Sequence, residues 1–132
     1  MRLIETLIKW VMLVSGLLTA TMLYAAIAPQ AALISMFGET LSGPLAQIVV
    51  RNWGALIGIV GILLVYGAFD ALSRPLILIV AGISKIIFIG LVLSQGGRYL
   101  QHQAGIAIAI DLLMVTLFAI YLVSAYRNRA SA

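Results

Sequence analysis

The chain has 132 residues, of which 64% are hydrophobic and 9% are charged. Soluble domains carry roughly 25% charged residues, so this composition cannot cover a water-facing surface and indicates an integral membrane protein. The formal net charge of +4 comes from basic residues scattered along the chain. At predicted helix ends such residues favour contact with lipid headgroups, and nucleic acid is not an expected partner. Cysteine is absent, which excludes disulfides and thiol redox chemistry.

Four apolar stretches follow one another along the chain, at residues 7–28, 53–69, 75–94 and 104–126. A helix needs about 20 residues to cross a hydrocarbon core roughly 30 Å thick, and these stretches are close to that length. The sequence therefore predicts an all-α fold, a four-transmembrane-helix bundle that forms one integral membrane domain over residues 1–132.

Residues 29–52 separate the first two predicted spans and are punctuated by prolines and glycines. Apolar side chains between Pro29 and Gly38 recur at helical spacing, and the stretch is too short to span. It predicts a short interfacial or re-entrant segment between helices 1 and 2. Arg51 and Trp53 resemble membrane-interface anchors, so the second span is expected to start at about Trp53.

The distribution of basic residues predicts the orientation in the membrane. Five of them lie at the ends of the chain or in the turn at 70–74, on one predicted side: Arg2, Lys9, Arg74, Arg127 and Arg129. The other side has only Arg51 and Arg98. Because cytoplasmic loops carry an excess of Lys and Arg, both termini are expected in the cytoplasm. The predicted location is a bacterial inner (plasma) membrane.

Two charged residues, Lys85 and Asp111, lie well inside predicted spans. A charge at the centre of a membrane helix costs about 2.5–3.5 kcal/mol, so an unpaired one is disfavoured. Lys85 lies about 13–14 Å below Ser94, at the outer end of the third span, at 1.5 Å per residue. Asp111 lies about 10–11 Å below Ala104, at the outer end of the fourth span. Short loops make these helices antiparallel neighbours, so the two charges are expected to meet.

An intramembrane ion pair of this kind has two interpretations. It can be structural, fixing helix register, or it can form the polar part of a site for an ion or a ligand. A third outcome is that no pair forms and Lys85 snorkels to the interface. A cavity that reaches Lys85 and Asp111 would favour the ligand site, whereas aliphatic packing around the pair would favour the structural role.

Three glycines, Gly54, Gly58 and Gly61, lie on one face of the second predicted span. Small residues at this spacing allow helix backbones to approach closely. The face is expected to pack inside the bundle, with a homo-oligomer seam as the alternative.

The outer loops hold the remaining candidates. Glu39 and Arg51 could pair over the mouth of the bundle, but both are expected to face water. His102 is the only histidine, and it is expected to be a solvated loop residue, since a metal site needs several ligands. No metal site, cofactor or catalytic constellation is predicted, because none of the usual motifs occurs.

Two stretches, "PQAALISMFGETLSGP" after the first span and "VVRNWGALIGIVG" opening the second, complete a layout that resembles the DoxX-like superfamily. These are small bacterial four-helix membrane proteins. The resemblance covers about residues 7–126, and its best match is Arg51 followed by Gly54. It implies the four-helix architecture, and some members are linked to respiratory or sulfur-oxidising membrane complexes.

The sequence leaves three functions open. The first is a non-enzymatic accessory or interaction subunit of a larger membrane complex or homo-oligomer, surrounded by membrane lipids. The second is a carrier or binder of a small lipophilic molecule or ion that uses Lys85 and Asp111. The third is an enzyme acting on a lipid, with Asp111 as the base.

Overall fold

A computed structural model describes residues 2–131, and within this range it contains helices and no strands. The elements in chain order are α1 (Arg2–Ala20), η1 (Thr21–Leu23), α2 (Tyr24–Ile27), α3 (Pro29–Phe37), α4 (Pro44–Phe69), α5 (Arg74–Leu93) and α6 (Gln103–Ser131). Four helical stretches are long and apolar enough to cross a membrane: Leu3–Ile27, Pro44–Phe69, Arg74–Leu93 and Gln103–Arg129. The predicted all-α bundle with four membrane-spanning helices is confirmed.

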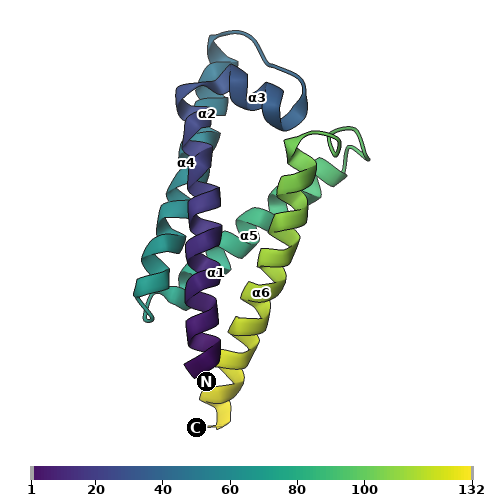
Figure 1. Ribbon diagram of the computed structural model, residues 1–132. Coiled ribbons are helices and arrows are strands. Elements are labelled where there is room, and N and C mark those ends of the chain that lie inside the picture. Colours follow the sequence, from purple (N-terminus) through teal and green to yellow (C-terminus); the bar gives the residue numbers. More distant parts are fainter. Residues whose placement is uncertain (1, 132) are drawn as a thin grey trace.

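The first span runs through α1, η1 and α2, and it ends where a proline follows. Ala28 leaves the helical region with φ −128° and ψ 71°, as expected for a residue that precedes proline. Pro29 then starts α3, where its missing N–H costs no hydrogen bond. Gly38 ends α3 with a positive φ of 74°, a conformation that glycine adopts without strain. A nine-residue helix thus lies across one end of the bundle (Figure 1). Its position in a membrane interface stays a prediction.

The start of the second span differs from the prediction. α4 begins at Pro44, so residues 44–52 form its first turns and do not belong to the connecting segment. Pro44 is placed at the first turn, a favourable position for proline, and Gly43 precedes it with φ 102°. Arg51 and Asn52 lie within the helix, because polar residues at a membrane boundary do not require the helix to stop there. With 26 residues, α4 is about 39 Å long and exceeds the hydrocarbon core.

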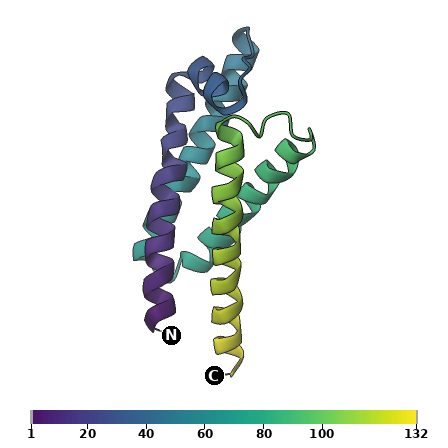
Figure 2. The same ribbon diagram turned by 45° about the vertical axis from the view of Figure 1, so that its right-hand side comes forward.

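The helices pack as two pairs, α1 with α4 and α5 with α6. The pairs meet near the end that carries both chain termini and separate towards the end covered by α3 (Figure 1). Figure 2 shows the two termini at the same end from a second direction. α3 contacts both α4 and α6, so it bridges the two pairs at their separated end.

The main core lies in the half of the bundle near the termini. Its buried side chains come from all four long helices: Ile8, Met12, Leu64, Ala68, Ile77, Leu78, Ala81, Met114, Phe118 and Tyr121. A smaller cluster between α5 and α6, near the loop that joins them, comprises Ile89, Val92, Ala104 and Ile108. The separated part of the bundle is therefore less fully packed than the terminal part.

The glycine face of α4 packs against the first span within the same chain. Gly54, Gly58 and Gly61 are buried, and a Cβ added at any of them would meet atoms of α1, η1 or α2. At Gly61 the added Cβ would lie 2.7 Å from the carbonyl oxygen of Gly16 and would also collide with the backbone nitrogen of Ala20. The structure therefore places this face inside the bundle.

We expect Gly61→Ala to destabilise the bundle by about 1–3 kcal/mol, because backbone atoms cannot move aside as a flexible side chain does. Gly90→Ala is the matched control: it makes the same chemical change in α5, where no atom lies within 4 Å of the added Cβ. That variant should be neutral or more stable by roughly 0.5–1 kcal/mol. Unfolding curves in mixed micelles would measure both, and equal effects would contradict the close α1–α4 contact.

Candidate ligand-binding cavity

Lys85 of α5 and Asp111 of α6 lie side by side between the helix pairs. The Lys85 Nζ atom is 2.7 Å from Asp111 Oδ1, and the two side chains are 8% and 17% exposed. Lys85 Nζ also donates to Thr19 Oγ1 of α1 at 3.3 Å. The structure thus brings together the two residues that the depth argument paired, and it adds a hydroxyl from the first span.

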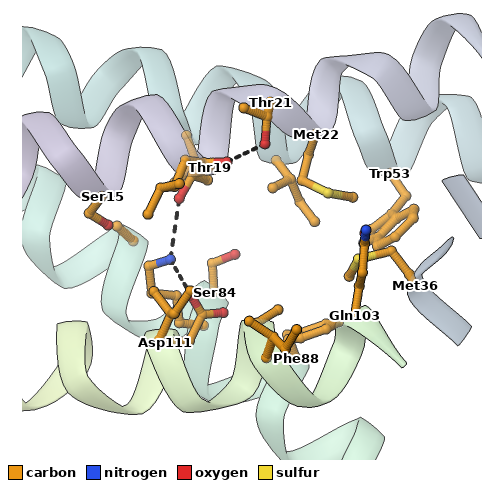
Figure 3. A pocket seen from close by; sticks show the side chains of 18 of the residues that line it. Ser15, Thr19, Thr21, Met22, Met36, Trp53, Ser84, Phe88, Gln103 and Asp111 are labelled. Carbon is orange, nitrogen blue, oxygen red and sulfur yellow. Dashed lines mark hydrogen bonds and ion pairs between the residues drawn. The ribbon is translucent and has the colours of Figure 1, made fainter. Parts of the chain in front are cut away.

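A cavity of about 330 Å³ adjoins this contact. Its volume falls at the lower end of the range for small-molecule sites, roughly 300–1,000 Å³. All the long helices and α3 contribute to its wall, and Ser15, Thr19 and Asp111 lie at one end, while Met36, Trp53 and Gln103 lie at the other (Figure 3). The cavity therefore has a charged end and an opposite end where an aromatic ring and a thioether lie beside one amide.

Ser15 is a second polar group of the cavity wall. It is 1% exposed, and its Oγ atom has no hydrogen-bond partner among the described residues. A buried hydroxyl without a partner costs roughly 1–3 kcal/mol, so native proteins rarely retain one without a reason. Ser15 lies at the polar end of the cavity wall (Figure 3), but its Oγ atom is closed off from the cavity space.

The cavity reaches the outside of the bundle between α1 and α6. Leu18 on α1 and Ile106 on α6 both line it, and they are 47% and 64% exposed. These side chains belong to two of the stretches long and apolar enough to span a membrane. An apolar molecule could therefore reach the cavity sideways, from the lipid.

A second cavity of about 410 Å³ lies next to the first, and Trp53 and Phe88 line both. It lies under α3, where Phe37 contacts Trp53 at a ring-centroid distance of 6.2 Å and Tyr99 at 5.4 Å. Aromatic side chains thus separate the inner cavity from the outer loops.

Glu39 is half exposed to water, as expected, and it also joins the outer loops through a partner that was not predicted. Its carboxylate forms an ion pair with Arg98 and accepts a hydrogen bond from Tyr99 Oη at 3.0 Å. Arg51 is exposed on α4 and is not the partner. Arg98 was not predicted as the partner, because Glu39 and Arg51 bracket one loop whereas the fold brings two loops together.

The hydrogen bond from Arg98 lowers the pKa of Glu39, and the same contact raises the pKa of Arg98. The hydrogen bond to Glu39 also raises the pKa of Tyr99. Because the pKa of Glu39 is depressed, its contribution is present at neutral pH and is lost as the pH falls through that pKa. The contact between the loops is therefore complete at neutral pH.

A second polar cluster, centred on the buried Arg74 at the terminal end, was not predicted from the sequence. Arg74 is 5% exposed, and its guanidinium donates to the carbonyls of Gly67 and Ala68 at 3.0 Å and to Glu5 Oε2 at 2.7 Å. Tyr121 Oη donates to the same carboxylate at 3.1 Å. Arg74 thus ties α5 to the last turn of α4 and to α1, and Glu5 extends the connection to α6.

His102 lies in the loop before α6, where its ring packs against Gly38. Within residues 2–131, no group of three His, Asp or Glu side chains is placed to hold a metal ion.

No protein-family model, curated protein or solved structure matches the chain.

Proposed function

We propose that this multi-pass membrane protein binds a small lipophilic molecule in the inner cavity, with the polar group of that molecule at Lys85 and Asp111. The observation that carries the proposal is that the 330 Å³ cavity reaches both charged side chains. A pair that served only helix register would be surrounded by aliphatic side chains. The exposed rim between α1 and α6, formed by Leu18 and Ile106, supports the same interpretation.

The cavity can be filled selectively by one substitution on α6. Ala107 lines the cavity, whereas Ala109 is exposed and does not. We expect the protein, taken from its membrane in mild detergent, to carry a lipophilic molecule that native mass spectrometry detects on the intact chain. Ala107→Phe should lose that molecule, since the ring occupies its volume. Ala109→Phe, with the same added ring on the same helix, should retain it.

Two results would contradict the proposal. One is a wild-type chain that carries no molecule and takes none up from an added total lipid extract. The other is retention by Ala107→Phe at the wild-type level, which would place the molecule elsewhere on the protein.

We also propose that the chain lies in a bacterial inner membrane with both termini in the cytoplasm, and that it belongs with the DoxX-like proteins. The position of both termini and the α4–α5 turn at one end of the bundle supports the orientation, because this end carries Lys9, Arg74, Arg127 and Arg129. The short α3 helix between the first two spans supports the likeness in layout.

A further inference from the structure

The charges on the cavity wall cancel. Lys85 and Asp111 are the only ionisable Lys, Arg, Asp or Glu side chains among the described residues that line it. They neutralise each other at 2.7 Å. An ionised guest would add net charge beside an ion pair that is already balanced, and a buried charge without its own partner is strongly disfavoured. A carboxylate would also compete with Asp111 for Lys85, and an ammonium group would compete with Lys85 for Asp111. The wall therefore favours an uncharged guest.

Both the ammonium group of Lys85 and the carboxylate of Asp111 can form further hydrogen bonds. An ammonium group has three N–H donors, and two from Lys85 are used by Asp111 and Thr19. Asp111 uses Oδ1 for Lys85, and its Oδ2 atom has no hydrogen bond to the described residues. A guest that both accepts and donates would meet these needs. A hydroxyl does this with one atom, whereas a carbonyl only accepts.

The remainder of the cavity is suited to an apolar body. Away from the ion pair it is lined mainly by Met22, Met36, Trp53 and Phe88, with the amide of Gln103 as the polar exception (Figure 3). A cavity of about 150 Å³ holds one benzene ring, and this one is roughly twice as large. A guest with its polar atom at Lys85 would therefore extend towards Trp53.

Building on the proposed function, we infer that the ligand is an uncharged lipophilic alcohol whose hydroxyl accepts from Lys85 and donates to Asp111, with its apolar part directed at Trp53. The pair then acts as an amphoteric polar anchor that selects against both fatty acids and lipophilic amines.

Four probes of equal chain length test this inference: ω-bromooctanol, ω-bromooctanoate, ω-bromooctylamine and bromooctane. Bromine quenches tryptophan fluorescence on close contact, and the chain has two tryptophans. Trp10→Phe leaves Trp53, which lines the cavity, as the reporter. Trp53→Phe leaves Trp10, which is 59% exposed on α1 and reports quenching from the surrounding lipid. Both variants are measured in lipid nanodiscs at neutral pH.

After correction by the Trp10 signal, ω-bromooctanol should half-quench Trp53 at a concentration at least about tenfold lower than the carboxylate or the amine, because each of these must lose its charge or strand a partner. Bromooctane should also be weaker. Combining Lys85→Met with Asp111→Leu should bring the alcohol to the level of bromooctane. Quenching by the alcohol should fall when Ala107→Phe fills the cavity.

The outcomes separate the two proposals. If the carboxylate, the amine or bromooctane quenches Trp53 as well as the alcohol does, and Ala107→Phe abolishes the effect, the cavity binds ligands but the alcohol assignment is wrong. If no probe quenches Trp53 beyond the Trp10 level, or if Ala107→Phe changes nothing, the proposed function fails as well.

Discussion

Replacing either member of the Lys85–Asp111 pair alone will lower the free energy of unfolding by about 3–5 kcal/mol, because the remaining charge loses its partner where it is largely shielded from water. The side chains are 8% and 17% exposed, and only the cavity beside them could admit water to the charge that remains. Lys85→Met leaves the carboxylate of Asp111 uncompensated, and Asp111→Leu does the same to the ammonium of Lys85. Denaturant titration in mixed micelles measures each loss.

The double variant is the informative comparison. Lys85→Met combined with Asp111→Leu removes both charges and replaces them with apolar groups, so its stability should lie within about 1 kcal/mol of the wild type. Arg98→Met supplies a matched control, because it breaks an ion pair whose side chains are 60% and 50% exposed. It should cost less than about 1 kcal/mol. If both single variants at the inner pair unfold like the wild type, water fills the cavity and the charges do not depend on each other.

Arg74→Met should be the next most damaging substitution, with a loss of about 3 kcal/mol. The guanidinium is buried and satisfies two backbone carbonyls at the end of α4 as well as Glu5, and buried acceptors left without their donors cost roughly 1–3 kcal/mol each. Removing it leaves the carbonyls of Gly67 and Ala68 without these donors. Thermal unfolding in detergent would measure the effect.

Arg74→Lys separates charge from geometry. A lysine keeps the positive charge but lacks the planar fork that reaches three acceptors at once. It should therefore recover less than half of the stability lost in Arg74→Met. Wild-type stability in Arg74→Lys would show that only the charge matters, and that the contacts to the α4 carbonyls are dispensable. Glu5→Gln should cost less than Arg74→Met, because Glu5 is 41% exposed and water can replace its partner.

The fold could be predicted because helices that face lipid need long stretches of apolar residues, which are visible in the sequence. Long apolar stretches must form helices, since every backbone polar group needs a partner within the segment. The approach of Lys85 to Asp111 followed from helix rise alone, because two antiparallel helices joined by a short loop place equal depths side by side. The start of α4 was missed, since Pro44 and Gly43 fit equally well with a loop and with the first turn of a helix.

The cavity could not be predicted from the sequence, and the Arg74 cluster was missed. The cavity depends on how far the two helix pairs separate, and helix periodicity does not encode that distance. Arg74 was counted only as a basic residue near a membrane boundary. Any arrangement with four spans places three polar residues at the same end of the bundle: Glu5, Arg74 and Tyr121. Their common position was the sequence signal that could have predicted the cluster.

The accessory-subunit prediction rested on the scarcity of polar groups in the spans. That scarcity is compatible with a binding protein as well, since one ion pair and a few hydroxyls suffice to orient a lipophilic guest. A stable complex with other subunits stays a prediction.

The fastening of the helix pairs at one end has a mechanical consequence. Arg74 and the main core hold the terminal end together, whereas the far end is joined by α3 and the loop contacts. α5 is about 30 Å long, so a tilt of roughly 5° about the fastened end would move its tip by about 2.6 Å. Such a tilt changes the width of the cavity without repacking the side chains at the terminal end. The range of ligand sizes that the cavity accepts would then depend on the packing around Arg74, far from the side chains that contact the ligand.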